Sequence, residues 1–189
     1  VNDLARILHE ALYVATHGRP GPVVVDIPKD VQFATGKYVG PKNIEHKTYR
    51  PQVKPNQDAI RAAVELISKA KRPLLYTGGG AINSGVIASK LLREFVKMTN
   101  IPITSTLMGL GAYPASGKNW LGMLGMHGMY EANMAMHDCD VMINIGARFD
   151  DRVAAVPARF ARNAKRIAHM DVDASEINKV KRVQWSHVG

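Results

Sequence analysis

The chain has 189 residues and a formal net charge of +9, from 25 Lys and Arg against 16 Asp and Glu. It has 46% hydrophobic residues, enough to fill a core, but its mean hydropathy is −0.13 and no apolar run reaches about 18 residues, which excludes a membrane-spanning helix. A single cysteine excludes an internal disulfide framework and fits a reducing compartment. Because the basic residues are dispersed and aromatic residues make up only 6%, we expect no nucleic-acid or membrane partner.

The first predicted elements are a helix over residues 3–17 and a strand over residues 23–27. The helix has one apolar face and ends at a Gly- and Pro-rich run. The strand is a continuous β-branched run, typical of a buried parallel sheet, and Pro28 ends it. Residues 34–57 are polar, rich in Gly and Pro and without a period, which predicts an interdomain linker with a boundary near residue 45.

After the linker, strands and helices alternate. Asn56 is expected to cap a helix whose apolar face runs from Ile60 to Ala70. The later elements expected are a loop at 78–80, helices over 85–98 and 129–138, a helical turn over 174–178, and strands over 73–77, 101–104, 141–145 and 166–170. This alternation predicts an α/β fold, with a parallel sheet covered by helices on both faces and right-handed crossovers.

Ligands of open parallel sheets bind at the carboxyl ends of strands, so the segments there are the candidates for chemistry. Gly78-Gly79-Gly80 follows the first strand after the linker, and glycines let a backbone approach a phosphate closely. A Rossmann fingerprint would need a glycine in place of Asn83, and a P-loop would need Lys-Ser/Thr in place of Val86-Ile87. A tight turn that binds nothing remains the alternative for this loop.

Two further segments, Thr104–Gly111 and Leu121–Gly128, alternate glycine with leucine and methionine. They predict a soft apolar surface for a flat heteroaromatic ring, with ordinary core filling as the alternative for the methionines. His127 could act as a base or a ligand, but no His, Cys or carboxylate stands at ligand spacing from it. We therefore expect a hydrogen bond or loop packing for His127 and no metal site.

The segment Gly146-Ala147-Arg148-Phe149-Asp150-Asp151-Arg152 follows the strand over 141–145. Guanidinium groups bind phosphate or carboxylate in bidentate geometry, and a solvated, salt-bridged loop is the alternative. Asp171 follows the strand over 166–170, where an acidic residue commonly binds a ribose hydroxyl. Together the segments indicate a dinucleotide other than conventionally bound NAD.

In these motifs the chain resembles the large catalytic subunits of acetolactate synthase, a family of thiamine-diphosphate enzymes. The segments that carry the resemblance, which covers essentially the whole chain, are Gly18–Val23, Asp26–Val31, Gly78–Gly80, Leu121–Gly128 and Gly146–Arg152. It implies that residues 1–33 end a pyrimidine-binding domain, that residues 34–55 are a linker, and that residues 56–189 form most of a Rossmann-like central FAD-binding domain.

The resemblance also implies an activity: condensation of two pyruvates, or of pyruvate and 2-ketobutyrate, to 2-acetolactate or 2-aceto-2-hydroxybutyrate with release of CO2. This reaction belongs to branched-chain amino-acid biosynthesis. The segment would bind FAD in a structural role, whereas thiamine diphosphate and Mg2+ would bind outside residues 1–189, so this chain alone would be inactive. A cytoplasmic homodimer or homotetramer with a regulatory small subunit is implied as well.

The resemblance assigns roles to individual residues. Arg152 would hold the carboxylate of the acceptor 2-keto acid, and Lys29, Met126 and Asp151 would line the substrate channel. The residues implied to bind FAD are Arg19, Gly78, Gly79, Gly80, Leu107, Met108, Leu124, Gly125, Met126, His127, Gly128, Gly146, Ala147, Arg148, Asp150, Asp171 and Val172. The alternatives are a related thiamine-diphosphate enzyme, such as pyruvate oxidase or another carboligase, and a nucleotide-binding or interaction module without catalysis.

Overall fold

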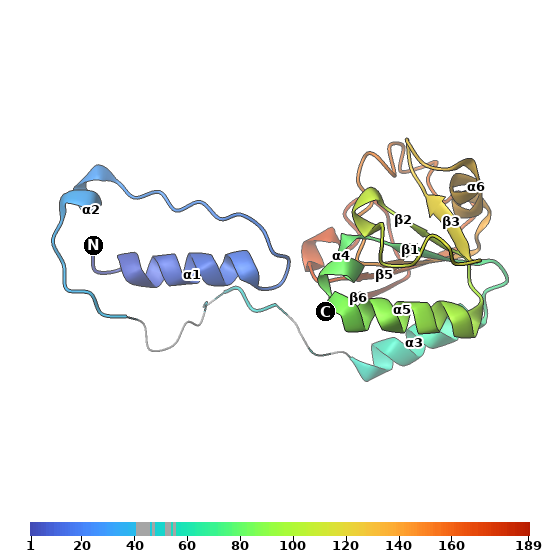
Figure 1. The fold of residues 1–189 in the computed structure, drawn as a ribbon, viewed down its shortest axis with the longest axis horizontal. Helices are drawn as coiled ribbons and strands as arrows, with labels where there is room; N and C mark the ends of the chain where they lie inside the picture. Colours follow the sequence, from blue (N-terminus) through green and yellow to red (C-terminus); the bar gives the residue numbers. More distant parts are fainter. Residues whose placement is uncertain (41–45, 47, 52–53, 55) are drawn as a thin grey trace. The chain divides into compact units, whose positions relative to one another are not determined.

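The computed structural model describes residues 1–40, 46, 48–51, 54 and 56–189 (Figure 1). The chain forms two compact units, Val1–Val53 and Lys54–Gly189. The boundary predicted near residue 45 falls on residues outside the described ranges.

The first unit holds helix α1 (Leu4–Thr16) and the short helix α2 (Lys29–Phe33). The helix predicted over residues 3–17 is confirmed to within one residue at each end. The strand predicted over residues 23–27 is wrong, because this segment pairs with no strand in the described part of the chain and Val24 is 92% exposed. A β-branched run becomes a strand only where a neighbouring strand satisfies its backbone groups.

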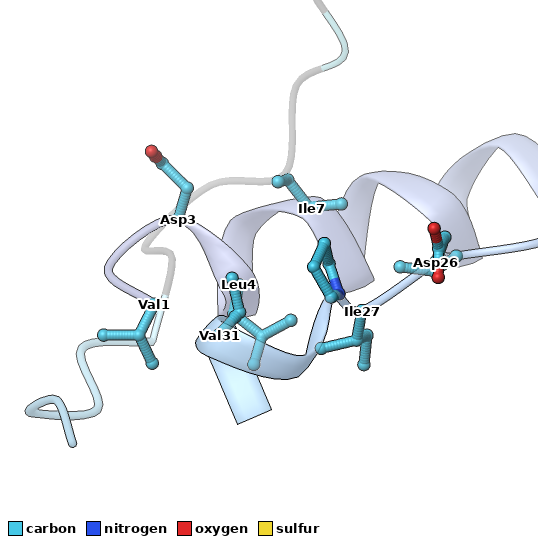
Figure 2. A pocket seen from close by; sticks show the side chains of 9 residues that line it. Val1, Asp3, Leu4, Ile7, Asp26, Ile27 and Val31 are labelled. Carbon is cyan, nitrogen blue, oxygen red and sulfur yellow. The ribbon is translucent and has the colours of Figure 1, made fainter. Parts of the chain in front are cut away.

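A small hollow of about 180 Å³ lies between α1 and the segment that leads into α2 (Figure 2). Its lining is mostly apolar and consists of Val1, Asp3, Leu4, Ile7, Val25, Asp26, Ile27, Pro28 and Val31. Pockets for cofactors and drug-sized ligands usually measure about 300–1,000 Å³. The hollow is therefore too small for a dinucleotide, and none of the predicted site residues lines it.

The second unit is built on a six-stranded parallel sheet with the order β3-β2-β1-β4-β5-β6 (Figure 1). The strands are β1 (Pro73–Thr77), β2 (Ile103–Ser105), β3 (Trp120–Met123), β4 (Val141–Ile145), β5 (Arg166–Asp171) and β6 (Trp185–Val188). The parallel sheet is confirmed, and the four predicted strands correspond to β1, β2, β4 and β5. The prediction missed β3 and β6, which are short edge strands without a β-branched run.

Helices cover both faces of the sheet, as predicted (Figure 1). They are α3 (Gln57–Ser68), α4 (Gly79–Asn83), α5 (Gly85–Thr99) and α6 (Tyr130–Asp138), with short 3-10 turns η1 (Leu107–Gly109) and η2 (Ala174–Glu176). Asn56 caps α3 by accepting hydrogen bonds from two backbone amides of its first turn. The prediction of a loop over residues 78–80 is wrong in part, because Gly79 and Gly80 form the start of α4.

Side chains that alternate along the strands supply one core for each face. On one face, Leu75 and Ile143 pack with residues of α3, α4 and α5. On the other, Leu74 and Met142 pack with α6 and with the irregular segment after β4, including Phe149. Within the described ranges, no helix is both long enough and apolar enough to cross a membrane.

Replacing Leu75 by Ala should lower the free energy of unfolding of the second unit by about 2–5 kcal/mol, because Leu75 is fully buried at the centre of the sheet. Leu91→Ala on α5 is the matched control; Leu91 is 57% exposed, and we expect a change of at most about 0.5 kcal/mol. Urea unfolding followed by tryptophan fluorescence measures both, since Trp120 and Trp185 lie in the edge strands of this unit. Equal losses would contradict this placement of Leu75.

The single cysteine, Cys139, gives a second test of the core. It is buried where α6 ends, its Sγ donates to the carbonyl oxygen of Met136 at 3.2 Å, and burial raises the pKa of its thiol to about 12. Since the thiolate is the reactive form, and only about one thiol in ten thousand is ionised at pH 8, a disulfide reagent should label Cys139 only as urea unfolds the chain. Rapid labelling of the native protein would contradict the buried position.

Candidate functional site

The strand order reverses between β1 and β4, because the chain continues from β1 to β2 on one side and returns with β4 on the other. At such a point the loops that leave the two strands diverge, and a ligand can bind between them. Gly78–Gly80 leaves β1 and Gly146–Arg148 leaves β4. The structure therefore brings two of the predicted segments together at the carboxyl edge of the sheet.

These two turns touch through their backbones. The amide of Gly78 donates to the carbonyl oxygen of Ile145 at 3.0 Å, and that of Gly80 donates to the carbonyl oxygen of Gly146 at 2.9 Å. A Cβ atom at Gly78 would overlap the carbonyl oxygen of Gly146, and one at Gly80 would lie 2.7 Å from the Gly146 Cα. Glycine is thus required for this contact, and the amides of Gly78 and Gly80 are used within the protein.

Gly79 differs from its two neighbours. Its amide donates to no other atom in the described part of the chain, and a Cβ there would lie 3.3 Å from the Cβ of Met108. Gly79 therefore has the one backbone N–H of the three that could donate to an oxygen atom of a ligand. The segment with Leu107 and Met108, both largely exposed, lies beside it.

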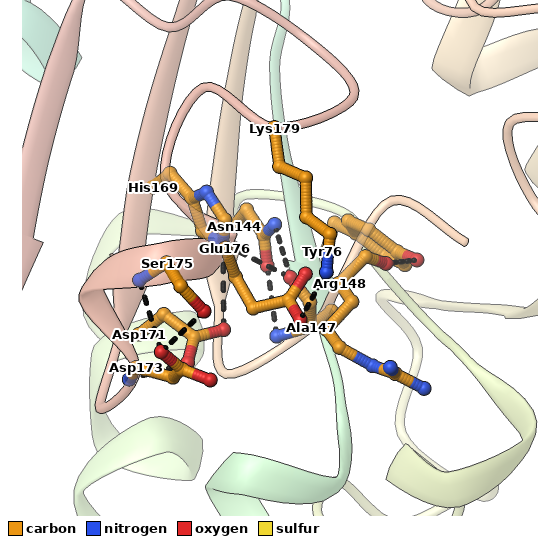
Figure 3. A network of polar contacts seen from close by, with 10 residues as sticks. All are labelled: Tyr76, Asn144, Ala147, Arg148, His169, Asp171, Asp173, Ser175, Glu176 and Lys179. Carbon is orange, nitrogen blue, oxygen red and sulfur yellow. Dashed lines mark hydrogen bonds and ion pairs between the residues drawn. The ribbon is translucent and has the colours of Figure 1, made fainter.

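A row of buried polar side chains fixes the turn after β4 (Figure 3). Tyr76, Asn144 and His169 are register partners on β1, β4 and β5, and all three are fully buried. Asn144 makes two hydrogen bonds with Ala147: its Nδ2 donates to the carbonyl oxygen at 2.6 Å and its Oδ1 accepts from the amide at 3.1 Å. The hydroxyl of Tyr76 donates to the carbonyl oxygen of Arg148 at 3.3 Å.

His169 completes this row. Its Nε2 lies 3.1 Å from the carbonyl oxygen of Ala147, which can only accept, so Nε2 has the proton. The same nitrogen lies 3.5 Å from Oδ2 of Asp171, whose Oδ1 accepts from the Asp173 amide at 2.9 Å. The predicted ribose-binding Asp171 thus lies at the end of β5 within the network that fixes the Arg148 turn. The Asp171 side chain is itself buried.

Burial, with the Asp150 carboxylate nearby, raises the pKa of Tyr76 far above its ordinary value. The Tyr76 hydroxyl is therefore protonated over the whole physiological pH range and remains a donor to Arg148. Arg148, which follows Ala147 in this turn, is exposed. Its backbone is fixed while its guanidinium remains available to an anion.

The Leu121–Gly128 segment reaches the same edge. The Leu124 amide donates to the carbonyl oxygen of Ser105 at 3.2 Å, and the Met126 amide donates to the carbonyl oxygen of Arg152 at 2.9 Å. Met126 and Met129 are 57% and 55% exposed, so core filling is wrong for these two methionines. Leu124 is buried.

The remaining predicted residues differ in their positions. His127, Asp151 and Arg152 are exposed at the same edge, next to the backbone hydrogen bond between Met126 and Arg152. Asp150 and Val172 are half-buried. Arg19 and Lys29 belong to the first unit, whereas the other predicted site residues belong to the second.

Sequence reasoning missed the polar residues that support this edge, which are the buried Tyr76, Asn144 and His169 and the half-buried Asn133. The signal for two of them was a polar residue inside an apolar strand, in Met142-Ile143-Asn144-Ile145 and Ile167-Ala168-His169-Met170. A buried polar side chain must find a hydrogen-bond partner, so such an interruption indicates a fixed contact.

Within the described ranges, no three His, Cys, Asp or Glu side chains come together as ligands for a metal ion. The edge does offer what a dinucleotide needs: an unused amide, an exposed arginine, a carboxylate and apolar side chains.

Comparison with known proteins gives a consistent result. Residues 60–189 match the family described as "Thiamine pyrophosphate enzyme, central domain". The chain is 46% identical over 189 residues to the acetolactate synthase large subunit of Buchnera aphidicola subsp. Schizaphis graminum, covering 99% of this chain and 33% of the relative. It is 44% identical to the acetolactate synthase isozyme 3 large subunit of Escherichia coli, covering 99% and 32%. The corresponding values for the acetolactate synthase large subunit of Corynebacterium glutamicum are 47%, 100% and 30%. The chain thus spans about a third of the length of these relatives.

Adjacent glycines in the β1 turn should respond differently to alanine. Gly78→Ala should lower the free energy of unfolding by about 1–3 kcal/mol, because its Cβ would displace the Gly146 turn. Gly79→Ala should cost less, since its Cβ would come no nearer than 3.3 Å to the Cβ and 3.5 Å to the carbonyl oxygen of Met108, and alanine favours the helix that starts there. Urea unfolding measures both, and a larger loss for Gly79→Ala would contradict the described contact.

Proposed function

Since the chain belongs to the thiamine pyrophosphate enzymes through their central domain, we propose that it is the FAD-binding region of an acetolactate synthase large subunit. Residues 56–189 would be the central domain, residues 34–55 a linker, and residues 1–33 the end of a pyrimidine-binding domain. The whole enzyme would join two pyruvates, or pyruvate and 2-ketobutyrate, with release of CO2.

The observation that carries this proposal is the convergence of the predicted segments on one sheet edge. The unused Gly79 amide and the exposed Arg148 suit the two phosphates of a dinucleotide, and Asp171 suits a ribose hydroxyl. The exposed side chains of Met108 and Met126 suit one face of a flat ring. FAD, when bound, supplies a redox-active ring, but the net reaction involves no oxidation, so FAD would act structurally.

Arg152 is proposed to bind the carboxylate of the acceptor 2-keto acid, a group that a guanidinium holds in bidentate geometry. Its exposed side chain lies on the segment that bonds to the backbone of Met126. Met126 and Asp151 are proposed to line the substrate channel. Thiamine diphosphate and Mg2+ would supply the carbon–carbon chemistry from other parts of the enzyme.

The similarity to several proteins named as acetolactate synthase large subunits supports this function over a pyruvate oxidase or another carboligase. The words "large subunit" in those names support a regulatory small subunit as partner. A cytoplasmic homodimer or homotetramer completes the proposal.

Replacement of Arg148 and replacement of Arg152 should impair different functions. In the full-length enzyme, Arg148→Ala should weaken FAD binding by about tenfold or more, because a phosphate loses a charge-assisted contact. Arg152→Ala should retain FAD and raise the KM for the acceptor by a similar factor. Flavin fluorescence during titration measures the first effect, and initial rates of acetolactate formation measure the second.

Each variant is the control for the other, because both replace an exposed arginine of the same segment. Equal loss of FAD in the two variants would contradict the division of roles. Consumption of oxygen in step with pyruvate would favour the oxidase, in which the flavin is reduced and reoxidised.

A further inference from the structure

Asn133 on α6 contacts the glycine-rich loop after β3. Its Oδ1 accepts a hydrogen bond from the Gly125 amide at 2.9 Å, and its Nδ2 donates to the Gly125 carbonyl oxygen at 3.1 Å. One half-buried side chain thus satisfies both backbone groups of Gly125, as a neighbouring strand would. The loop is thereby anchored to α6.

From Gly125 the contacts continue to Arg152. Gly125 has φ +103°, and a Cβ there would lie 2.8 Å from the carbonyl oxygen of Arg152, so the two segments meet only because the residue is glycine. The next amide, that of Met126, donates to this same carbonyl oxygen at 2.9 Å. Asn133, Gly125, Met126 and Arg152 therefore form a continuous series of contacts from α6 to the Arg152 backbone.

This series fixes the separation between two exposed side chains. Met126 offers an apolar thioether and Arg152 a cation, and an acceptor 2-keto acid has an apolar end and a carboxylate that suit them. The spacing of the two backbones then decides how long an apolar end the site accepts. We propose that Asn133 is a positioning residue that sets the selectivity among 2-keto acid acceptors, an inference that rests on the proposed function of Arg152.

The test is Asn133→Ala in the full-length enzyme, with pyruvate and 2-ketobutyrate as competing acceptors. Loss of both bonds removes the contact between Gly125 and α6, and a displacement near 1 Å at a positioned group can change rates by about a hundredfold. We expect the ratio of the two products to shift by about tenfold or more. A general loss of stability would lower both rates and leave the ratio unchanged.

Asn119→Ala is the matched control. Asn119 also makes two side-chain hydrogen bonds, to the carbonyl oxygen and Oδ1 of Asn100 at 2.8 and 3.2 Å, but it precedes β3 at the amino edge of the sheet. It should leave the product ratio unchanged. Asn133→Asp is a second variant, which keeps the acceptor for the Gly125 amide but sets a carboxylate oxygen against the Gly125 carbonyl oxygen, and it should shift the ratio in the same direction.

Two outcomes would overturn the proposal: an unchanged product ratio in both Asn133 variants, or an equal shift in Asn119→Ala. A double variant shows whether the effect acts through Arg152, since Asn133→Ala should add little to the ratio in the Arg152→Ala background. A normal acceptor KM in Arg152→Ala alone would instead overturn the proposed function of Arg152. The two failures are therefore distinguished by the single Arg152 variant.

Discussion

The direct contact between two backbone turns at the point where the strand order reverses is the constraint on which the site depends. Gly78 and Gly80 meet Gly146 with no space for a Cβ atom, and two amide hydrogen bonds join the turns. Because nothing larger than hydrogen fits between them, β1 and β4 continue as a pair beyond their last strand residues. Only Gly79 is turned away from this pairing, which leaves its amide for a ligand.

The buried polar row adds a second fixed point on the same turn. Asn144 and His169 converge on the carbonyl oxygen of Ala147, and Tyr76 bonds to the next carbonyl (Figure 3). The two bonds to Ala147 are formed inside the core, where solvent cannot compete for them and where breaking them would leave a buried polar group without a partner. Arg148 is thus held at its backbone while its side chain is exposed, which favours an anion site that is formed before the ligand arrives.

The central elements were predictable from the sequence because their apolar patterns are strong. Continuous apolar runs identified β1 and β4, and helical spacing with the Asn56 cap identified α3. The edge strand with Trp185 was not predictable, since it is half-exposed and its pairing depends on β5 rather than on its own residues. The strand predicted over 23–27 failed for the converse reason, because its residues favour a sheet that the first unit does not contain.

The candidate site was likewise predictable only in part. The glycine and arginine segments could be found from residue type, because phosphate chemistry restricts which residues serve there. The sequence could not show which of the three glycines has an amide that stays unused within the protein. This depends on the contact with Gly146, which is 66 positions away in the sequence from Gly80 (146 − 80). Met126 and Met129 show the same dependence, because core filling was the alternative for both and only the folded chain shows that they are exposed.

Two asparagines hold the two loops of the site in the same way, and the chemistry of the amide explains why. Asn133 pairs with both backbone groups of Gly125, and Asn144 pairs with both backbone groups of Ala147. A carboxylate in either place would lack the donor and would bury a charge, whereas a serine would supply one oxygen and reach less far. An asparagine instead presents a donor and an acceptor side by side, like one residue of a neighbouring strand, to a segment that has no strand beside it. Each loop is therefore held by one side chain at a residue whose backbone groups pair with no strand.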